Sequence, residues 1–324
     1  MQENMFKGVY AVVPTPLTED EGLDSSGLQH LINYYIESSC NGVLVLGSGG
    51  EFPYFSYAEK IKIVKEAINV VNGRVPLLVG VGFCSFVETM AFIKEVGEMR
   101  IDGFLVITTS FFPAGFEDVY GLYSQLCQES KKPILYYNYP QMTGLFFSPD
   151  QISRLLSLEG MVGMKDSIME IKKIHQHIKS IDNRKTAIFA GNSFSMRPVL
   201  DMGGSGVIEV TSSFAPRLVV DCYNACTEKD LKQANVLQEK ILDLMPLLSN
   251  FDLPSGVLKR VYKTISFLRI PMKKRNASRA AVIKETLKQL GHPITSKARS
   301  PQPQITDAEM DAIRGLIKKN QLSA

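Results

Sequence analysis

The chain has 324 residues, of which 45% are hydrophobic and 21% are charged, with 24 Gly and 16 Pro. This composition excludes a largely disordered or fibrous chain, and the length is sufficient for two domains. Lys and Arg total 36 against 33 Asp and Glu, and the net charge of +3 does not indicate nucleic acid as a partner. No apolar run approaches the roughly 18 residues that cross a bilayer, and Glu3, Pro14 and Pro16 argue against a signal peptide. We therefore expect no membrane association and a cytoplasmic protein.

The five cysteines are scattered and odd in number, which is not the pattern of a disulfide framework. We interpret all of them as reduced. Cys222 and Cys226 share a helical face and are alternative metal ligands, but no His or acid stands at a matching spacing. We therefore favour a place in the core for both thiols.

Short β-rich runs alternate with longer helical patterns over about 210 residues. The expected strands are 8–13, 42–46, 76–80, 103–107, 133–137, 161–165, 186–190 and 205–210. Periodic apolar segments between them, such as 57–71 and 86–99, predict helices. Continuous apolar strands indicate a parallel sheet covered on both faces. We predict an α/β fold with a (β/α)8 TIM barrel over 1–229; a doubly wound open sheet is the alternative, but no GxGxxG follows the first strand.

After about residue 230 the strand pattern stops and helical periodicity continues. The expected helices are 230–247, 257–267, 277–290 and 307–319. We predict a C-terminal helical domain over 230–324, with Thr306 or Asp307 as the N-cap of its last helix.

The C-terminal region is rich in basic residues, with twelve Lys or Arg and one acid, Glu285, between Lys259 and Arg299. A patch for an anionic partner is one interpretation. Charges spaced along helices are more often a solvated face, which is the interpretation that we favour.

Polar side chains at the carboxyl ends of barrel strands are the candidates for chemistry. All four histidines fall in helices or the tail, which argues against a Ser-His-Asp triad and a His-ligated metal. Lys165 follows the apolar run 161–164, so its strand would carry the amine into the barrel mouth, where desolvation favours the uncharged, nucleophilic form. The alternative is a lysine that reaches water or pairs with Asp166.

Two further strand ends carry groups that suit imine chemistry. Tyr137 ends the fifth strand, and a phenol beside a cation can move protons; we interpret Tyr136 and Tyr139 as packing residues. The loop 47–51 exposes backbone N–H groups that can hold a carboxylate, although a simple tight turn explains it as well.

Three segments taken together resemble a known family. They are Gly47-Ser48-Gly49-Gly50-Glu51, Tyr137-Asn138-Tyr139-Pro140 and Gly163-Met164-Lys165-Asp166-Ser167. Their order and spacing resemble the dihydrodipicolinate synthase / N-acetylneuraminate lyase family, and the resemblance covers nearly the whole chain. It implies a (β/α)8 barrel with a C-terminal helical domain. It also implies a class I pyruvate-dependent aldolase or lyase that uses no metal or other cofactor and forms a homotetramer or homodimer.

The resemblance implies catalytic roles for Lys165, Tyr137 and Ser48. Lys165 would form a Schiff base with the keto carbon of pyruvate or another 2-oxo acid, and Tyr137 would move protons at the imine and the substrate hydroxyl. Ser48 and the backbone around it would hold the carboxylate. The implied substrate-binding positions are Gly47, Ser48, Gly49 and Ile208, the last through its main-chain carbonyl.

Departures from the family pattern bear on the substrate. Met142 stands where the lysine-pathway synthase has an arginine, and 191–194 lacks the acids of the sialic acid lyases. The loop 47–52, the tyrosine motif and 213–216 are most similar to 2-keto-3-deoxy-gluconate aldolases. We therefore expect reversible cleavage of a 2-keto-3-deoxy sugar acid to pyruvate and an aldehyde.

The rival activities are those of a 4-hydroxy-tetrahydrodipicolinate synthase and a sugar-acid dehydratase. A pyruvate-binding or sugar-acid-binding paralogue without turnover is also an alternative, because Gly49 replaces a hydroxyl residue of the loop and Phe112 replaces a relay tyrosine of the partner subunit. Glu209, at the end of the expected eighth strand, either faces the pocket or points outward into a salt bridge. The stretch 255–276 looks inserted relative to the family.

Overall fold

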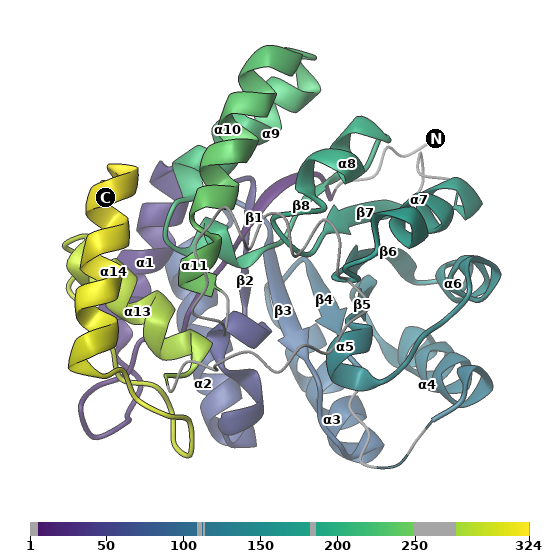
Figure 1. The fold of residues 1–324 in the computed structure, drawn as a ribbon. Helices are drawn as coiled ribbons and strands as arrows, with labels where there is room; N and C mark the ends of the chain where they lie inside the picture. The colour runs from purple at the N-terminus through teal and green to yellow at the C-terminus, as the bar shows by residue number, and fades with distance from the viewer. Residues whose placement is uncertain (1–5, 109–111, 113, 182–185, 249–276, 324) are drawn as a thin grey trace.

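The protein forms a closed barrel of eight parallel strands (Figure 1), as seen in a computed structural model that describes residues 6–108, 112, 114–181, 186–248 and 277–323. Each strand pairs with its neighbours in the chain, and the last strand pairs with the first. The predicted (β/α)8 barrel is therefore confirmed, and the open sheet is excluded. The inserted stretch 255–276 and the expected helix 257–267 lie outside the described residues.

The observed strands follow the predicted ones closely, with one exception. They are β1 (Gly8–Val12), β2 (Gly42–Val45), β3 (Leu77–Val81), β4 (Gly103–Val106), β5 (Ile134–Asn138), β6 (Met161–Asp166), β7 (Ala187–Ala190) and β8 (Gly206–Val207). The eighth strand ends earlier than the predicted residue 210. Glu209 accepts hydrogen bonds from the backbone N–H groups of Thr211 and Ser212, and this cap starts the 3-10 turn η3 (Val210–Ser213).

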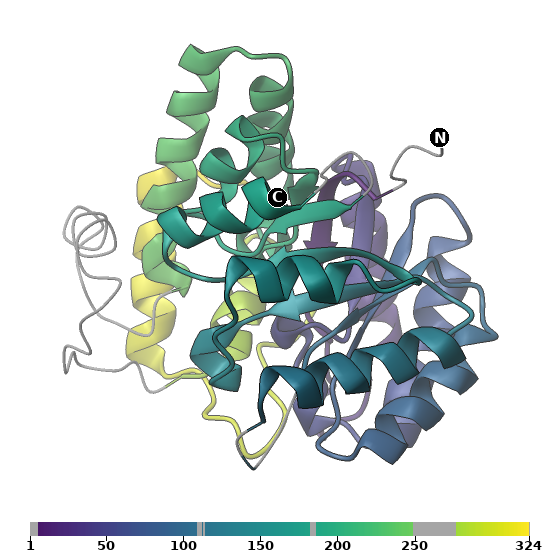
Figure 2. The same cartoon turned by 90° about the vertical axis from the view of Figure 1, so that its right-hand side faces the viewer.

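Helices surround the barrel, as the two views at right angles show (Figures 1 and 2). They are α1 (Ser25–Glu37), α2 (Tyr57–Val71), α3 (Phe86–Gly97), α4 (Phe116–Glu129), α5 (Pro140–Thr143), α6 (Pro149–Leu156), α7 (Ile171–Ser180), α8 (Met196–Asp201) and α9 (Pro216–Thr227). Helix α2 has the predicted bounds, because Ser56 and Glu59 form a capping box at its start. The short turns η1 (Ser48–Gly50) and η2 (Phe52–Tyr54) lie between β2 and α2.

The C-terminal part of the described chain is helical. Its helices are α10 (Leu231–Asp243), α11 (Met245–Leu248), α13 (Arg279–Gln289) and α14 (Asp307–Asn320). Thr306, one of the two predicted alternatives, is the N-cap of α14. Helix α10 packs along α9, and α13 contacts the turn η1 at the barrel mouth. The domain division at residue 229 remains a prediction.

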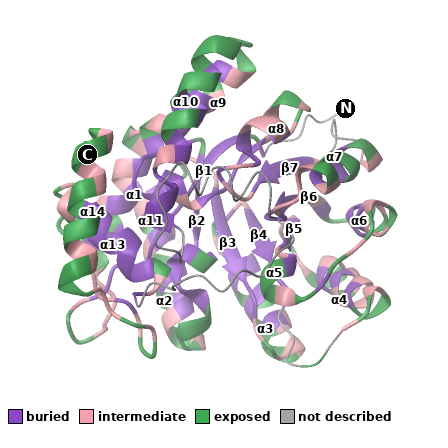
Figure 3. Ribbon diagram, in the orientation of Figure 1, coloured by how far each residue is buried: buried purple, intermediate pink, exposed green. Residues whose placement is uncertain are grey.

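Buried residues concentrate in the strands and on the barrel-facing sides of the helices (Figure 3). All but one of the residues in β1 to β8 are buried, which explains why the strands lack in/out alternation in sequence. The five cysteines are free thiols; of the two expected in the core, Cys222 is buried and Cys226 is half-buried and packs against the core. Within the described ranges, none of the helices combines the length and apolar character needed to cross a bilayer.

The packing of β6 against β7 generates a stability prediction at Gly163. A Cβ atom at this position would lie 2.2 Å from the carbonyl oxygen of Ala187, so the strands would have to move apart. We expect Gly163→Ala to lower the free energy of unfolding by about 1–3 kcal/mol or more, measured by urea denaturation. The control is Gly121→Ala in α4, where nothing lies within 4 Å and a gain of up to about 1 kcal/mol is expected. Equal stability of Gly163→Ala and the wild type would contradict the close approach.

Candidate active site

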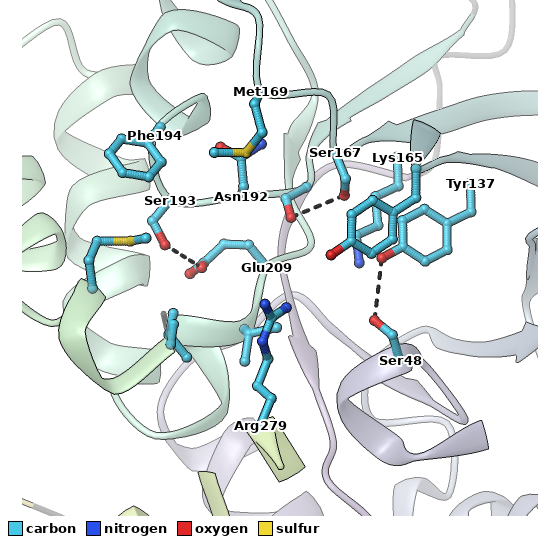
Figure 4. Close-up of a pocket in the computed structure, with 15 residues that line it drawn as sticks. Ser48, Tyr137, Lys165, Ser167, Met169, Asn192, Ser193, Phe194, Glu209 and Arg279 are labelled. Atoms are coloured by element: carbon cyan, nitrogen blue, oxygen red, sulfur yellow. Dashed lines mark hydrogen bonds between the residues drawn. The ribbon is translucent and has the colours of Figure 1, made fainter. Parts of the chain in front are cut away.

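A cavity of about 110 Å³ lies at the carboxyl ends of the strands (Figure 4). Its wall includes Ser48 after β2, Tyr137 of β5 and Lys165 of β6. The structure therefore brings the three predicted catalytic residues to one rim of the barrel. Gly47 and Gly49 are buried on either side of Ser48, and Ile208 is buried just after β8; these three are not among the described residues that line the cavity.

The strand β6 directs Lys165 and the following Asp166 to opposite faces. Lys165 is only 2% exposed and lines the cavity. The carboxylate of Asp166 accepts hydrogen bonds from Asn138 Nδ2 at 2.9 Å and the amide of Ile168 at 3.1 Å, and it lies 2.8 Å from Nδ1 of His177 in α7. The two alternatives for Lys165, a side chain in bulk water and an ion pair with Asp166, are therefore wrong.

Tyr137 is the neighbour of Lys165 on the adjacent strand, because the two residues are paired in the register of β5 and β6. The Lys165 Nζ atom lies 4.2 Å from the centroid of the Tyr137 ring, and the Tyr137 hydroxyl lies 3.3 Å from Ser48 Oγ. Burial opposes ionisation of the phenol, but the charge of Lys165 and hydrogen bonds from Ser48, Lys165 and Ser167 outweigh it and lower the pKa of Tyr137. A phenol with these neighbours is suited to move protons beside an amine.

The loop after β2 places Ser48 at the start of the turn η1. The amide of Gly50 donates to the carbonyl of Gly47 at 3.0 Å, and the carbonyl of Gly50 accepts a hydrogen bond from Thr15 Oγ1 at 2.8 Å. Glu51 ends the turn in the left-handed conformation with φ 62°. The loop is thus a tight turn fixed from both sides, with the Ser48 side chain directed to the cavity.

Glu209 faces the cavity, so the alternative of an outward salt bridge is wrong (Figure 4). Its carboxylate accepts hydrogen bonds from Ser193 Oγ and the Thr211 amide, both at 2.8 Å. Burial raises the pKa of Glu209, although these hydrogen bonds act in the opposite direction. Helix α10 supports the side of the cavity formed by Ser193 and Glu209, because Gln238 Nε2 donates a hydrogen bond to the carbonyl of Ser193 at 2.8 Å.

Several lining residues were not predicted from the sequence. Arg279 of α13 and Met245 and Leu248 of α11 reach the cavity from the C-terminal helices. Tyr139, interpreted as a packing residue, stacks on Tyr137 with ring centroids 5.5 Å apart and also lines the cavity. The stacking follows from the spacing, because residues two apart in an extended chain point to the same side. The placement of the C-terminal helices depends on tertiary contacts, which a local sequence pattern does not indicate.

The cavity has a net basic wall in the part of the chain that the structure describes. Lys165, Glu209 and Arg279 are its charged lining residues. Two basic groups against one acid suit a ligand with one carboxylate. No group of three or more His, Cys, Asp or Glu within the described ranges is arranged to hold a metal ion.

Comparison with known proteins gives relatives of two activities. The chain is 29% identical to the probable 2-dehydro-3-deoxy-D-pentonate aldolase YjhH of Escherichia coli K12 over 242 residues, or 74% of this chain and 80% of the relative. It is also 29% identical to the 4-hydroxy-tetrahydrodipicolinate synthase of Syntrophus aciditrophicus over 290 residues, or 89% of this chain and 99% of the relative.

Solved structures share the fold over almost the full length. YagE of Escherichia coli K12, solved in complex with pyruvate, has a TM-score of 0.86 at 24% identity and covers 98% of this chain and 99% of its own. Dihydrodipicolinate synthase of Thermotoga maritima has a TM-score of 0.83 at 25% identity, with coverage of 98% and 99%. The model of the dihydrodipicolinate synthetase family matches residues 5–289. The closed barrel and the buried lysine agree with this match. The chain therefore belongs to the dihydrodipicolinate synthetase family, whose members are lyases and aldolases.

Proposed function

We propose that this protein is a class I aldolase that reversibly cleaves a 2-keto-3-deoxy sugar acid to pyruvate and an aldehyde. The observation that carries the proposal is the buried contact between the Lys165 amine and the Tyr137 ring, with the phenol hydroxyl beside Ser48. As the family resemblance implies, the enzyme would act without a metal or other cofactor, as a homotetramer or homodimer. We also propose that it acts in the cytoplasm, as the sequence led us to expect.

The reaction begins at the amine of Lys165, which adds to the C2 carbonyl of the substrate. Loss of water leaves a protonated imine. Removal of the proton from the C4 hydroxyl lets the C3–C4 bond break, and its electron pair moves into the imine to form an enamine while C4 leaves as the aldehyde. The enamine takes a proton at C3, and water then releases pyruvate and the free amine.

Tyr137 carries the protons in these reaction steps. Its hydroxyl lies beside the amine that forms the imine, and its lowered pKa makes the phenolate, the form that accepts the proton of the C4 hydroxyl, easier to populate than for an ordinary phenol. Ser48, at 3.3 Å from the phenol, orients that hydroxyl and offers its own to the carboxylate of the substrate. Gly47, Gly49 and the carbonyl of Ile208 complete the oxo-acid site in this proposal.

The groups beyond Lys165 support a sugar acid as the substrate. Asn192, Ser193 and Glu209 present an amide, a hydroxyl and a carboxylate to the cavity, which are the groups that hydrogen-bond hydroxyls. Met142 is 72% exposed and is not among the described lining residues, so a carboxylate-binding arginine is missing at this position. The similarity to a 2-dehydro-3-deoxy-D-pentonate aldolase points the same way.

One observation favours a second function, that of a 4-hydroxy-tetrahydrodipicolinate synthase. Arg279 lines the cavity from α13 and can hold a carboxylate on the aldehyde substrate in place of the missing arginine. The synthase relative matches a larger share of this chain than the aldolase relative does.

Schiff-base formation is tested by trapping with pyruvate and sodium borohydride. We expect a reduced adduct on Lys165, located by peptide mass mapping, and none in Lys165→Ala, because Lys165 is the only lysine among the described residues that line the cavity. Lys62→Ala in α2, which removes a lysine that is 59% exposed, is the control and should retain the adduct. An adduct on another lysine would contradict the assignment.

Tyr137→Phe separates proton transfer from binding. We expect kcat for aldol cleavage to fall by about 10²–10⁴-fold, the usual contribution of a general acid-base group, while trapping with pyruvate is much less affected. Tyr139→Phe keeps the stacked ring pair and the Ser48 contact, and serves as the matched control. Equal losses in turnover and in trapping would count against the role of the phenol.

The aldehyde partner distinguishes the candidate functions. We expect glycolaldehyde and glyceraldehyde to condense with pyruvate faster than aspartate semialdehyde, and Arg279→Met to change their KM little. If the protein is the synthase, aspartate semialdehyde is preferred, and Arg279→Met raises its KM by about 10- to 100-fold through loss of a charge-assisted hydrogen bond. Arg154→Met, which removes an exposed arginine paired with Glu117, is the control. Trapping without turnover of any aldehyde would identify a binding protein.

A further inference from the structure

A fully buried ion pair joins the end of the turn η1 to the helix α13. Glu51, the residue that ends the turn η1, is 1% exposed, and Lys284 of α13 is 0% exposed. Their charged groups lie 2.5 Å apart, although the two residues are far apart in the chain. Lys284 was expected on a solvated helix face with the other basic residues of this region, and that expectation is wrong for it.

The other hydrogen bonds of both charged groups are made with the same C-terminal segment. Glu51 Oε2 accepts from the amide of Arg299 at 2.8 Å and from Gln302 Nε2 at 2.5 Å. Lys284 Nζ also donates to the carbonyl of Lys297 at 2.7 Å. The carboxylate is therefore held on both oxygens by residues that follow the barrel in sequence.

Stability alone does not account for this arrangement. Burial removes both charges from water, and replacing such a pair by apolar residues of similar volume is often neutral or stabilising. The same burial lowers the pKa of Lys284, although the charge of Glu51 acts against this shift. A buried pair can, however, hold one geometry, because a displaced Glu51 carboxylate would lose its contacts with Lys284, Arg299 and Gln302 without water to replace them.

The fixed geometry is that of the turn beside the reacting lysine. Glu51 adopts φ 62°, a left-handed conformation that residues other than glycine rarely adopt, and its amide contacts the carbonyl of Ser48 at 3.3 Å. The carbonyl of Gly50 is held by Thr15 on the opposite side. A shift of the Glu51 side chain would therefore move the backbone of the turn and with it Ser48.

We propose that Glu51 and Lys284 are positioning residues for the reaction, through which α13 holds the turn Ser48–Gly50 in the conformation that binds the substrate carboxylate. The pair touches no substrate and acts through the turn. This inference rests on the proposed function, because it requires that the turn binds a 2-oxo acid. The C-terminal helices are then part of the active site and not only a cover over the barrel.

The test uses the full-length double variant Glu51→Gln/Lys284→Met. A single Lys284→Met change leaves a carboxylate buried without its partner and endangers folding, whereas the double change removes both charges. The half-saturating pyruvate concentration for borohydride trapping at Lys165 should rise at least about tenfold, as expected when a binding group is displaced. The adduct formed at saturating pyruvate should remain, so the effect is on binding and not on the amine.

A core variant in the same region controls for lost stability. Ile313→Ala in α14 shortens a side chain that is 0% exposed, and it should lower the melting temperature without changing the half-saturating concentration. A folded double variant with the half-saturation of the wild type would overturn the inference. The same rise in Ile313→Ala as in the double variant would also overturn it, since any destabilisation would then suffice.

A milder variant covers the case in which the double variant does not fold. Gln302→Met removes one donor to Glu51 from a half-buried position and leaves the ion pair in place. We expect a smaller rise in the same direction, and unchanged half-saturation would overturn the inference. Failure of the wild type to form any adduct with pyruvate would instead reject the proposed function itself.

Discussion

The contact between the Lys165 amine and the Tyr137 ring is the feature on which the rest of the site depends. Adjacent parallel strands present these residues at the same height, so backbone hydrogen bonds fix the distance between an amine and a phenol. The close approach of β6 and β7 at Gly163 holds the lysine strand in place. Because β5 and β6 are paired in the closed barrel, the side chains of Lys165 and Tyr137 are held side by side. Loops alone would hold two such groups less accurately.

The barrel was predictable because it depends on local patterns: apolar runs that alternate with periodic helices identify the strands. The same pattern places Lys165 and Tyr137 at strand ends but leaves the direction of the lysine side chain open, and the roles expected of Lys165, Tyr137 and Ser48 came from the family resemblance. The early end of β8 was not predictable, because it depends on Glu209 accepting hydrogen bonds from its own backbone neighbours. Arg279 and Lys284 were missed for a different reason: their positions are set by how α13 packs on the barrel, and helix periodicity does not indicate which barrel loop that helix meets.

The cavity is built from two sources with different physical roles. The strands supply the groups that react, which tolerate little displacement, while the loops after β7 and β8 and the helices α11 and α13 supply the wall that meets the remainder of a substrate. Members of this family with different activities can therefore share the first set and differ in the second. The chain is about equally similar to an aldolase and a synthase, and under the proposed function Lys165, Tyr137 and Ser48 suit either activity.

The register of β6 decides which of Lys165 and Asp166 faces the cavity, and the hydrogen bonds of Asp166 hold that register. Asp166 points away from the cavity, where Asn138 and His177 of α7 hold its carboxylate. A slip of β6 by one residue would turn Asp166 toward the cavity and Lys165 toward the layer between sheet and helix, where Asn138 and His177 hold the acid in the native register. Under the proposed function, a barrel in that register would lack its nucleophile as well as these hydrogen bonds.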